Sequence, residues 1–151
     1  MNIAIRQNFD FSKGDLSSPE QKAFLEYWQK IKGDKSMPSR VDFDPMKIPA
    51  SLPHIVMEDV HHDPLRFKLR LIGSKCNIPA SYLGKYIDEM PKMSQAIKIL
   101  RNCIEMRKPC LYYNTMALNS VIERHYSSLV LPFSQDGSDI NIFMTCHCLI
   151  D

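Results

Sequence analysis

The clearest secondary-structure pattern of the chain lies at residues 65–71, Leu-Arg-Phe-Lys-Leu-Arg-Leu. Apolar and basic side chains alternate there, so a strand would place the three leucines and Phe67 on one face and the basic side chains on the other. Such alternation is typical of an antiparallel strand with one face in the core and one in solvent. The stretch 54–62 also has strand composition, and the turn-forming Asp63-Pro64 separates it from 65–71. We therefore expect a β-hairpin here.

More strands are expected towards the C-terminus. They cover 110–118, 121–131 and 140–150, and a loop containing Asp136-Gly137 separates the last two. Before them, residues 91–107 have the apolar spacing of a helix that starts at Pro91. Strands on either side of this helix favour an α+β fold, one five-stranded antiparallel sheet with helices on one face and a cavity between them.

A separate N-terminal helix is predicted upstream of the hairpin. Ser18 can cap it, and Pro19 suits its first position. Gln21 can complete a capping box by reaching back to the Ser18 amide, and Gly33 can end the helix. Residues 1–18 before it are expected to form an N-terminal arm that includes an edge strand or an extended segment, and 19–151 a single domain.

Composition indicates a globular protein that binds neither nucleic acid nor membrane. The 151 residues are 44% hydrophobic and 24% charged, the balance of an ordinary folded domain. The formal net charge is only +2, and basic residues are interleaved with acidic ones, so no nucleic-acid surface is expected. No apolar run approaches the roughly 20 residues that cross a bilayer.

The cysteines indicate a reducing compartment. Their number is odd, their spacing is irregular, and no secretory signal is visible at the N-terminus. We therefore expect reduced thiols and a cytoplasmic location. The five positions are Cys76, Cys103, Cys110, Cys146 and Cys148.

Several short motifs are spread along the chain in a characteristic order and spacing. They are Tyr27-Trp28, Met37-Pro38-Ser39-Arg40, Asp44-Pro45, Leu52-Pro53-His54, Phe67, Arg70-Leu71-Ile72-Gly73, Leu83-Gly84, Leu131-Pro132-Phe133-Ser134 and Asp136-Gly137. Over roughly 23–149 they resemble a group of short PAS-type proteins from proteobacteria. This resemblance implies a PAS-like five-stranded antiparallel sheet with helices on one face. It also implies the general role of such domains, which bind a small ligand or cofactor, dimerise and signal to a partner.

The expected function is that of a stand-alone sensory or signalling module that binds a small ligand or a protein partner. The alternative is a ligand-free adaptor for protein interaction or dimerisation, whose surface would include Tyr27 and Trp28. No recognised catalytic motif occurs, so we expect no enzyme activity and no catalytic residues. The candidate residues for the wall of a ligand cavity are Cys76, Tyr82, Ile97, Tyr112, Tyr126, Met144 and Cys146.

Cofactors and metals find little support in the sequence. Cys76 is followed by Asn77-Ile78-Pro79, which does not match the asparagine-cysteine-arginine-phenylalanine run of light-sensing flavin domains. The helix at 91–107 has no histidine to ligate haem. Flavin and haem are therefore disfavoured, and the sequence does not identify a cofactor. Cys146-His147-Cys148 alternates along a strand, so its side chains cannot all reach one metal ion, and no metal site is expected. The two cysteines would be buried thiols or, alternatively, a thiol sensor.

Overall fold

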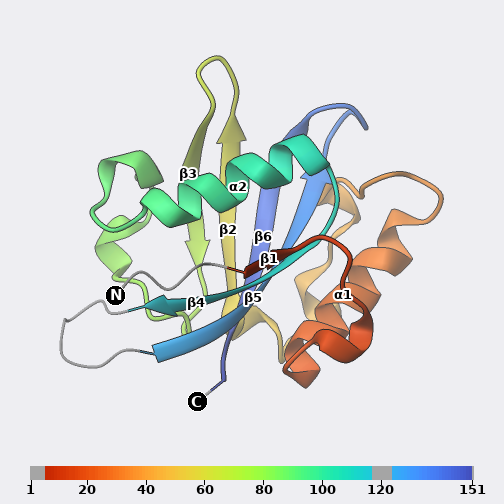
Figure 1. Cartoon of the computed structure of the whole chain (residues 1–151). Coiled ribbons are helices and arrows are strands. Elements are labelled where there is room, and N and C mark those ends of the chain that lie inside the picture. The colour runs from red at the N-terminus through yellow and green to blue at the C-terminus, as the bar shows by residue number, and fades with distance from the viewer. Residues whose placement is uncertain (1–5, 117–123, 151) are drawn as a thin grey trace.

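One antiparallel sheet of six strands forms the centre of the molecule, in the order β1-β4-β5-β6-β2-β3 (Figure 1). The computed structural model describes residues 6–116 and 124–150. The strands are β1 (Arg6–Asn8), β2 (Ile55–His61), β3 (Arg66–Ile72), β4 (Cys110–Met116), β5 (Arg124–Ser134) and β6 (Ile140–Leu149), and the helices are α1 (Pro19–Lys32) and α2 (Ser94–Met106). None of the helices in this described part is long and apolar enough to cross a membrane.

The predicted hairpin and the C-terminal strands are confirmed. β2 and β3 pair antiparallel on either side of the turn at 62–65, and β4, β5 and β6 follow in sequential antiparallel pairs. Residues 117–118 and 121–123 of the predicted strands lie outside the described residues. The sheet exceeds the five expected strands by one, because Arg6–Asn8 pairs with the free edge of β4.

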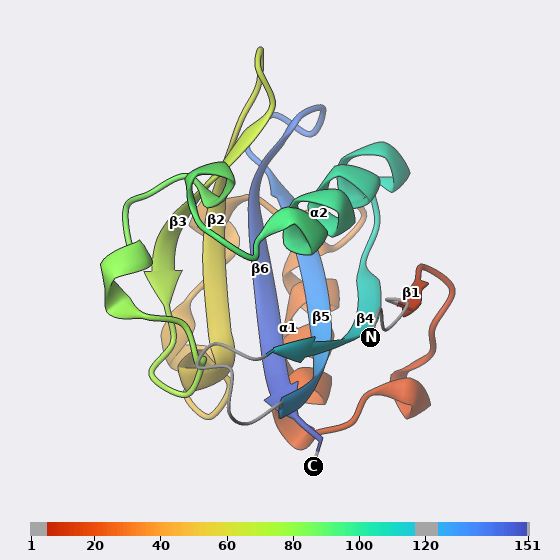
Figure 2. The same cartoon turned by 60° about the vertical axis from the view of Figure 1, so that its left-hand side comes forward.

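The helices cover opposite faces of the sheet, α2 one face and α1 the other (Figures 1 and 2). The alternation of side chains along β6 shows which residues meet each helix. Cys148 faces α1, because its Sγ lies 3.0 Å from Oγ of Ser18. His147 faces the opposite side, where it lines a cavity together with residues of α2. The N-terminal helix is therefore separate from the helical layer over the cavity, and both faces of β6 are covered.

The start of α1 is capped as predicted, but Gln21 has a different role. Oγ of Ser18 accepts a hydrogen bond from the Gln21 amide at 3.2 Å. The predicted bond from the Gln21 side chain back to the Ser18 amide is wrong, since Oε1 accepts from the Ser17 amide at 3.2 Å instead. Nε2 donates to the carbonyl oxygens of Ser127 at 2.9 Å and Cys146 at 3.2 Å. This buried amide therefore ties the first turn of α1 to β5 and β6.

Aromatic side chains fill the space between α1 and the sheet. The rings of Phe24 and Phe133 meet Phe43 edge-on, with centroids 6.4 Å and 5.9 Å apart. Trp28 lies on the same side of α1, and its Nε1 donates to the carbonyl oxygen of Pro132 at 2.9 Å. All four rings are buried, so this layer is a filled hydrophobic core.

A β-bulge changes the pattern predicted for β3. Met57 pairs with Leu71 and Glu58 pairs with Leu69, so Arg70 is an extra residue between them. The alternation predicted Leu71 in the core, but its side chain is 43% exposed. The bulge instead places Leu69 opposite Glu58, and both line the cavity on the α2 side.

Candidate functional site

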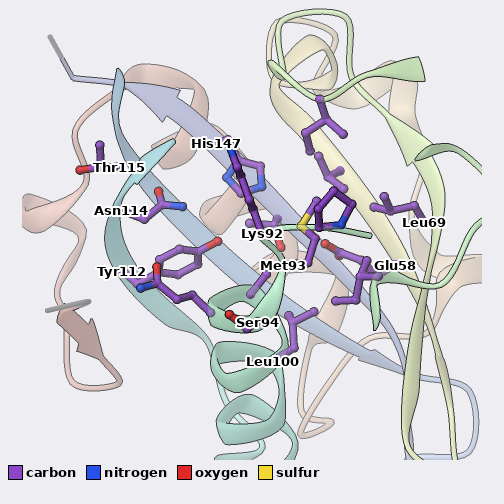
Figure 3. A pocket seen from close by; sticks show the side chains of 17 residues that line it. Glu58, Leu69, Lys92, Met93, Ser94, Leu100, Tyr112, Asn114, Thr115 and His147 are labelled. Atoms are coloured by element: carbon purple, nitrogen blue, oxygen red, sulfur yellow. The ribbon is translucent and has the colours of Figure 1, made fainter. Parts of the chain in front are cut away.

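A cavity with a volume of about 450 Å³ lies between the sheet and α2 (Figure 3). Its walls come from β2, β3, β4 and β6, from the segment between β3 and α2, and from the first turns of α2. The helix starts at Ser94 and not at the predicted Pro91. Residues 91–93 precede the helix and form part of the cavity wall. Pro91, Lys92, Ser94 and Gln95 are exposed, so the cavity opens to solvent beside the start of α2.

Most of the interior of the cavity is apolar. Val56 and Leu69 belong to the sheet, Ile87 precedes α2, and Leu100 projects from α2; all of them are buried. All four side chains are part of the hydrophobic core, so they provide a preformed apolar surface. A ligand in this cavity would gain most of its binding free energy from removal of apolar surface from water.

Polar groups from three strands converge on the same cavity. Glu58 comes from β2, Tyr112 and Asn114 from β4, and His147 from β6. Figure 3 shows Glu58 and Tyr112 pointing into the cavity from opposite sides. A mainly apolar pocket with a few converging polar groups is the usual composition of a small-molecule site.

Glu58 is the most unusual of these residues. Its side chain is 7% exposed, and its Oε2 has no hydrogen-bond partner among the residues that the structure describes. The ion pairs formed within 6–116 and 124–150 do not include it. Burial raises the pKa of this carboxyl well above its ordinary value. The group therefore holds its proton to higher pH than an exposed glutamate does.

Tyr112, Ser128 and His147 form a row across β4, β5 and β6. Ser128 is the cross-strand neighbour of both of the others. Its Oγ lies 2.7 Å from Nδ1 of His147. Burial lowers the pKa of the His147 ring from 6.5 to about 4, so the ring is neutral at neutral pH. Burial also raises the pKa of the Tyr112 phenol, which therefore stays protonated.

His147 is expected to make the protein less stable in acid. The unfolded chain takes up a proton on this ring near pH 6.5, whereas the folded chain takes it up only near pH 4. The stability that depends on the neutral ring is therefore complete above pH 6.5 and falls by roughly 3 kcal/mol as the pH drops to 4. Urea denaturation of the wild type and of His147→Gln between pH 4 and 7.5 measures this effect. Glu58 is present in both proteins, so its contribution cancels, and a difference independent of pH would contradict the prediction.

Only Tyr112 of the seven predicted wall residues lines the cavity. Met144 and Cys146 alternate with Thr145 and His147 on β6, so they face α1 instead. Cys76 and Tyr82 belong to the segment between β3 and α2, and Cys76 is buried with its Sγ 3.8 Å from the carbonyl oxygen of Pro53. Ile97 and Tyr126 also belong to the hydrophobic interior without lining the cavity.

Sequence reasoning missed Glu58, Asn114 and His147. A signal for Glu58 was present, because this carboxylate directly follows the apolar run Ile55-Val56-Met57 within β2. His147 was considered only as a metal ligand and set aside because it points away from its two cysteine neighbours. That orientation is correct, and it aims the ring into the cavity.

Tyr27 and Trp28 do not form an exposed surface. Trp28 is 4% exposed and packs in the core beneath α1. Tyr27 is half-buried, its ring contacts Phe43 at a centroid distance of 5.6 Å, and its OH accepts from the amide of Asp44 at 2.8 Å. The predicted interaction surface is corrected on this point, because the apolar face of α1 is covered by the protein's own residues.

Cys146 and Cys148 lie side by side on the α1 face. Their Sγ atoms are 3.9 Å apart, and both thiols are buried. All five cysteines of the chain are free thiols. Within residues 6–116 and 124–150, no group of three or more histidine, cysteine or acidic side chains could hold a metal ion.

Comparison with known proteins gives one family. A family model described as a PAS domain matches residues 16–146, which is most of the chain. No curated protein matches the sequence closely enough to be compared with it. The matched range begins just before α1 and ends in β6, so it includes both helices, the whole of β2, β3, β4 and β5, and most of β6.

Proposed function

Because the chain belongs to the PAS domain family, we propose that it is a sensory module that binds a small organic ligand in the cavity between α2 and the sheet. PAS domains are in general non-catalytic sensory or interaction modules. On this proposal the chain carries no enzyme activity, and it acts through a protein partner or a second copy of itself. The free cysteines agree with the cytoplasmic location that the sequence predicts.

The observation that carries the proposal is the cavity itself. Its volume of about 450 Å³ falls within the range of roughly 300–1,000 Å³ typical of ligand pockets. Its wall contains a buried carboxyl oxygen that has no hydrogen-bond partner among the described residues, a feature that costs stability unless something binds it. The other face of the sheet, by contrast, is covered by the buried aromatic layer beneath α1.

A route for the signal runs from the cavity to the N-terminal strand. Leu100 lines the cavity from α2, and the preceding residue, Ile99, accepts a hydrogen bond through its carbonyl oxygen from Nε2 of Gln7 in β1 at 3.1 Å. Oε1 of the same Gln7 accepts from Nδ2 of Asn102 at 2.8 Å. A ligand that moves α2 would therefore also move β1 at the edge of the sheet. This edge is where we expect the bound state to reach a partner.

Native mass spectrometry and thermal unfolding test the proposal. We expect the purified protein to retain a small molecule, or to be stabilised by some members of a metabolite library, because a ligand that binds only the folded state raises its stability. An Ala96→Phe variant places a ring in the cavity and is expected to remove both effects.

The matched control is Arg101→Phe, which adds the same ring at an exposed position of α2. It should behave like the wild type. A protein without retained mass and with a flat library response would contradict the proposal, as would an equal response of the Ala96→Phe variant.

A further inference from the structure

The polar groups in the cavity wall include acceptors that lack a donor. Oε2 of Glu58 and Oδ1 of Asn114 both have no hydrogen-bond partner in the described part of the chain. Both residues line the cavity, one from β2 and one from β4. Buried acceptors of this kind are stabilised by a ligand that brings N–H or O–H donors.

Glu58 is the one acidic side chain among the described residues of the cavity wall, and as a carboxylate it can balance the charge of a bound cation. The titratable groups in its wall are Glu58, Lys92, Tyr112 and His147. Lys92 is exposed at the mouth, and His147 is neutral, so these two place no positive charge in the interior. An anionic ligand would find no buried cation among the described wall residues to balance its charge.

We propose that the cavity selects a small organic ammonium ion, with its N–H groups directed at Glu58 and Asn114 and its apolar body among Val56, Leu69 and Leu100. This inference rests on the proposed function, since it names the ligand class of the same cavity. The ammonium supplies several donors at once, and the buried carboxylate that it meets gives a charge-assisted hydrogen bond. The remaining apolar wall requires that the nitrogen be attached to a hydrocarbon or aromatic body.

Binding of such a cation is coupled to release of a proton. In the free protein burial holds Glu58 in its protonated form to unusually high pH. A neighbouring ammonium favours the carboxylate, so the carboxyl proton leaves to the buffer as the ion pair forms. Affinity therefore rises with pH up to the pKa of Glu58 in the free protein. Tyr112 keeps its proton and His147 stays neutral through neutral pH, so they do not account for this rise.

Three probes of similar shape and different charge test the ligand class: phenethylamine, 2-phenylethanol and 3-phenylpropionate. Isothermal titration calorimetry at pH 8 should give the amine the highest affinity, roughly 10–100-fold above the alcohol, with the acid weakest. Glu58→Gln should remove most of this preference for the amine over the alcohol, because the neutral amide cannot form the ion pair. Titration of the wild type at pH 6 in two buffers of different ionisation enthalpy should show proton release for the amine only, a readout that needs no variant.

The failure of this inference can be told apart from failure of the proposed function. Binding of the alcohol or the acid as tightly as the amine, lost in Ala96→Phe but unchanged in Glu58→Gln, would overturn the ammonium class and keep the cavity as a ligand site. A retained molecule without a basic nitrogen would have the same meaning. If none of the probes binds and no molecule is retained, both proposals fall.

Discussion

A Gly73→Ala variant is expected to lose roughly 3–5 kcal/mol of unfolding free energy. A Cβ atom at this position would lie 2.4 Å from the carbonyl oxygen of Pro53 and 2.8 Å from that of Leu52. Both are backbone atoms, so no side-chain rotation can relieve the overlap. The backbone there is also held in place, because the Gly73 amide donates to the oxygen of Ile55 and the Lys75 amide to that of Pro53, each at 2.8 Å. The chain would have to break one of these bonds or distort the end of β3.

Gly14→Ala is the matched control for this prediction. Its new Cβ would lie 3.8 Å from Oγ of Ser12, an ordinary contact at an exposed position. We expect a change within about 0.5 kcal/mol for this surface substitution. Guanidinium denaturation of both variants and the wild type measures the difference. A Gly73→Ala protein as stable as Gly14→Ala would show that the two backbone segments are not in contact.

The contact at Gly73 also explains part of the sequence pattern. Leu52-Pro53-His54 and Arg70-Leu71-Ile72-Gly73 carry the resemblance to PAS-type proteins, and the structure brings these two motifs together. The glycine is required because the backbone before β2 passes too close for any side chain. The family resemblance is therefore based in part on a close packing of backbone segments, and it carries no information about a ligand.

The existence of the strands could be predicted from the sequence, but the direction of their side chains could not. β3 lies at the edge of the sheet, with basic side chains towards solvent, so its alternation is visible. β5 is different, because every residue from Tyr126 to Ser134 is buried. In β6 the residues of both faces are also largely buried, because helices cover both faces of the sheet. Without a solvent face, the sequence does not show which side of β6 meets the cavity, and Met144 and Cys146 were assigned to the wrong side.

The candidate site is hard to predict for a related reason. Its polar residues come from β2, β4 and β6, which are far apart in the sequence. The sheet order β4-β5-β6-β2 and the shared face place these residues around one cavity. Each of them alone is a polar side chain in a strand, which most often faces solvent. The bulge that places Leu69 opposite Glu58 also has no clear signal in the regular alternation of 65–71. The site is thus a product of sheet order and register.

Trp28→Ala is expected to cost roughly 3–5 kcal/mol of unfolding free energy and to leave the oligomeric state unchanged. The indole is 4% exposed among core side chains, and its removal leaves a cavity beneath α1 and the carbonyl of Pro132 without its donor. Trp28→Phe keeps most of the volume and loses only the hydrogen bond, so a smaller loss of about 1–3 kcal/mol is expected. Denaturation monitored by circular dichroism measures stability, and analytical ultracentrifugation measures mass. If Trp28 were instead part of an interaction surface, Trp28→Ala would change the assembly with little loss of stability, and that result would contradict its place in the core.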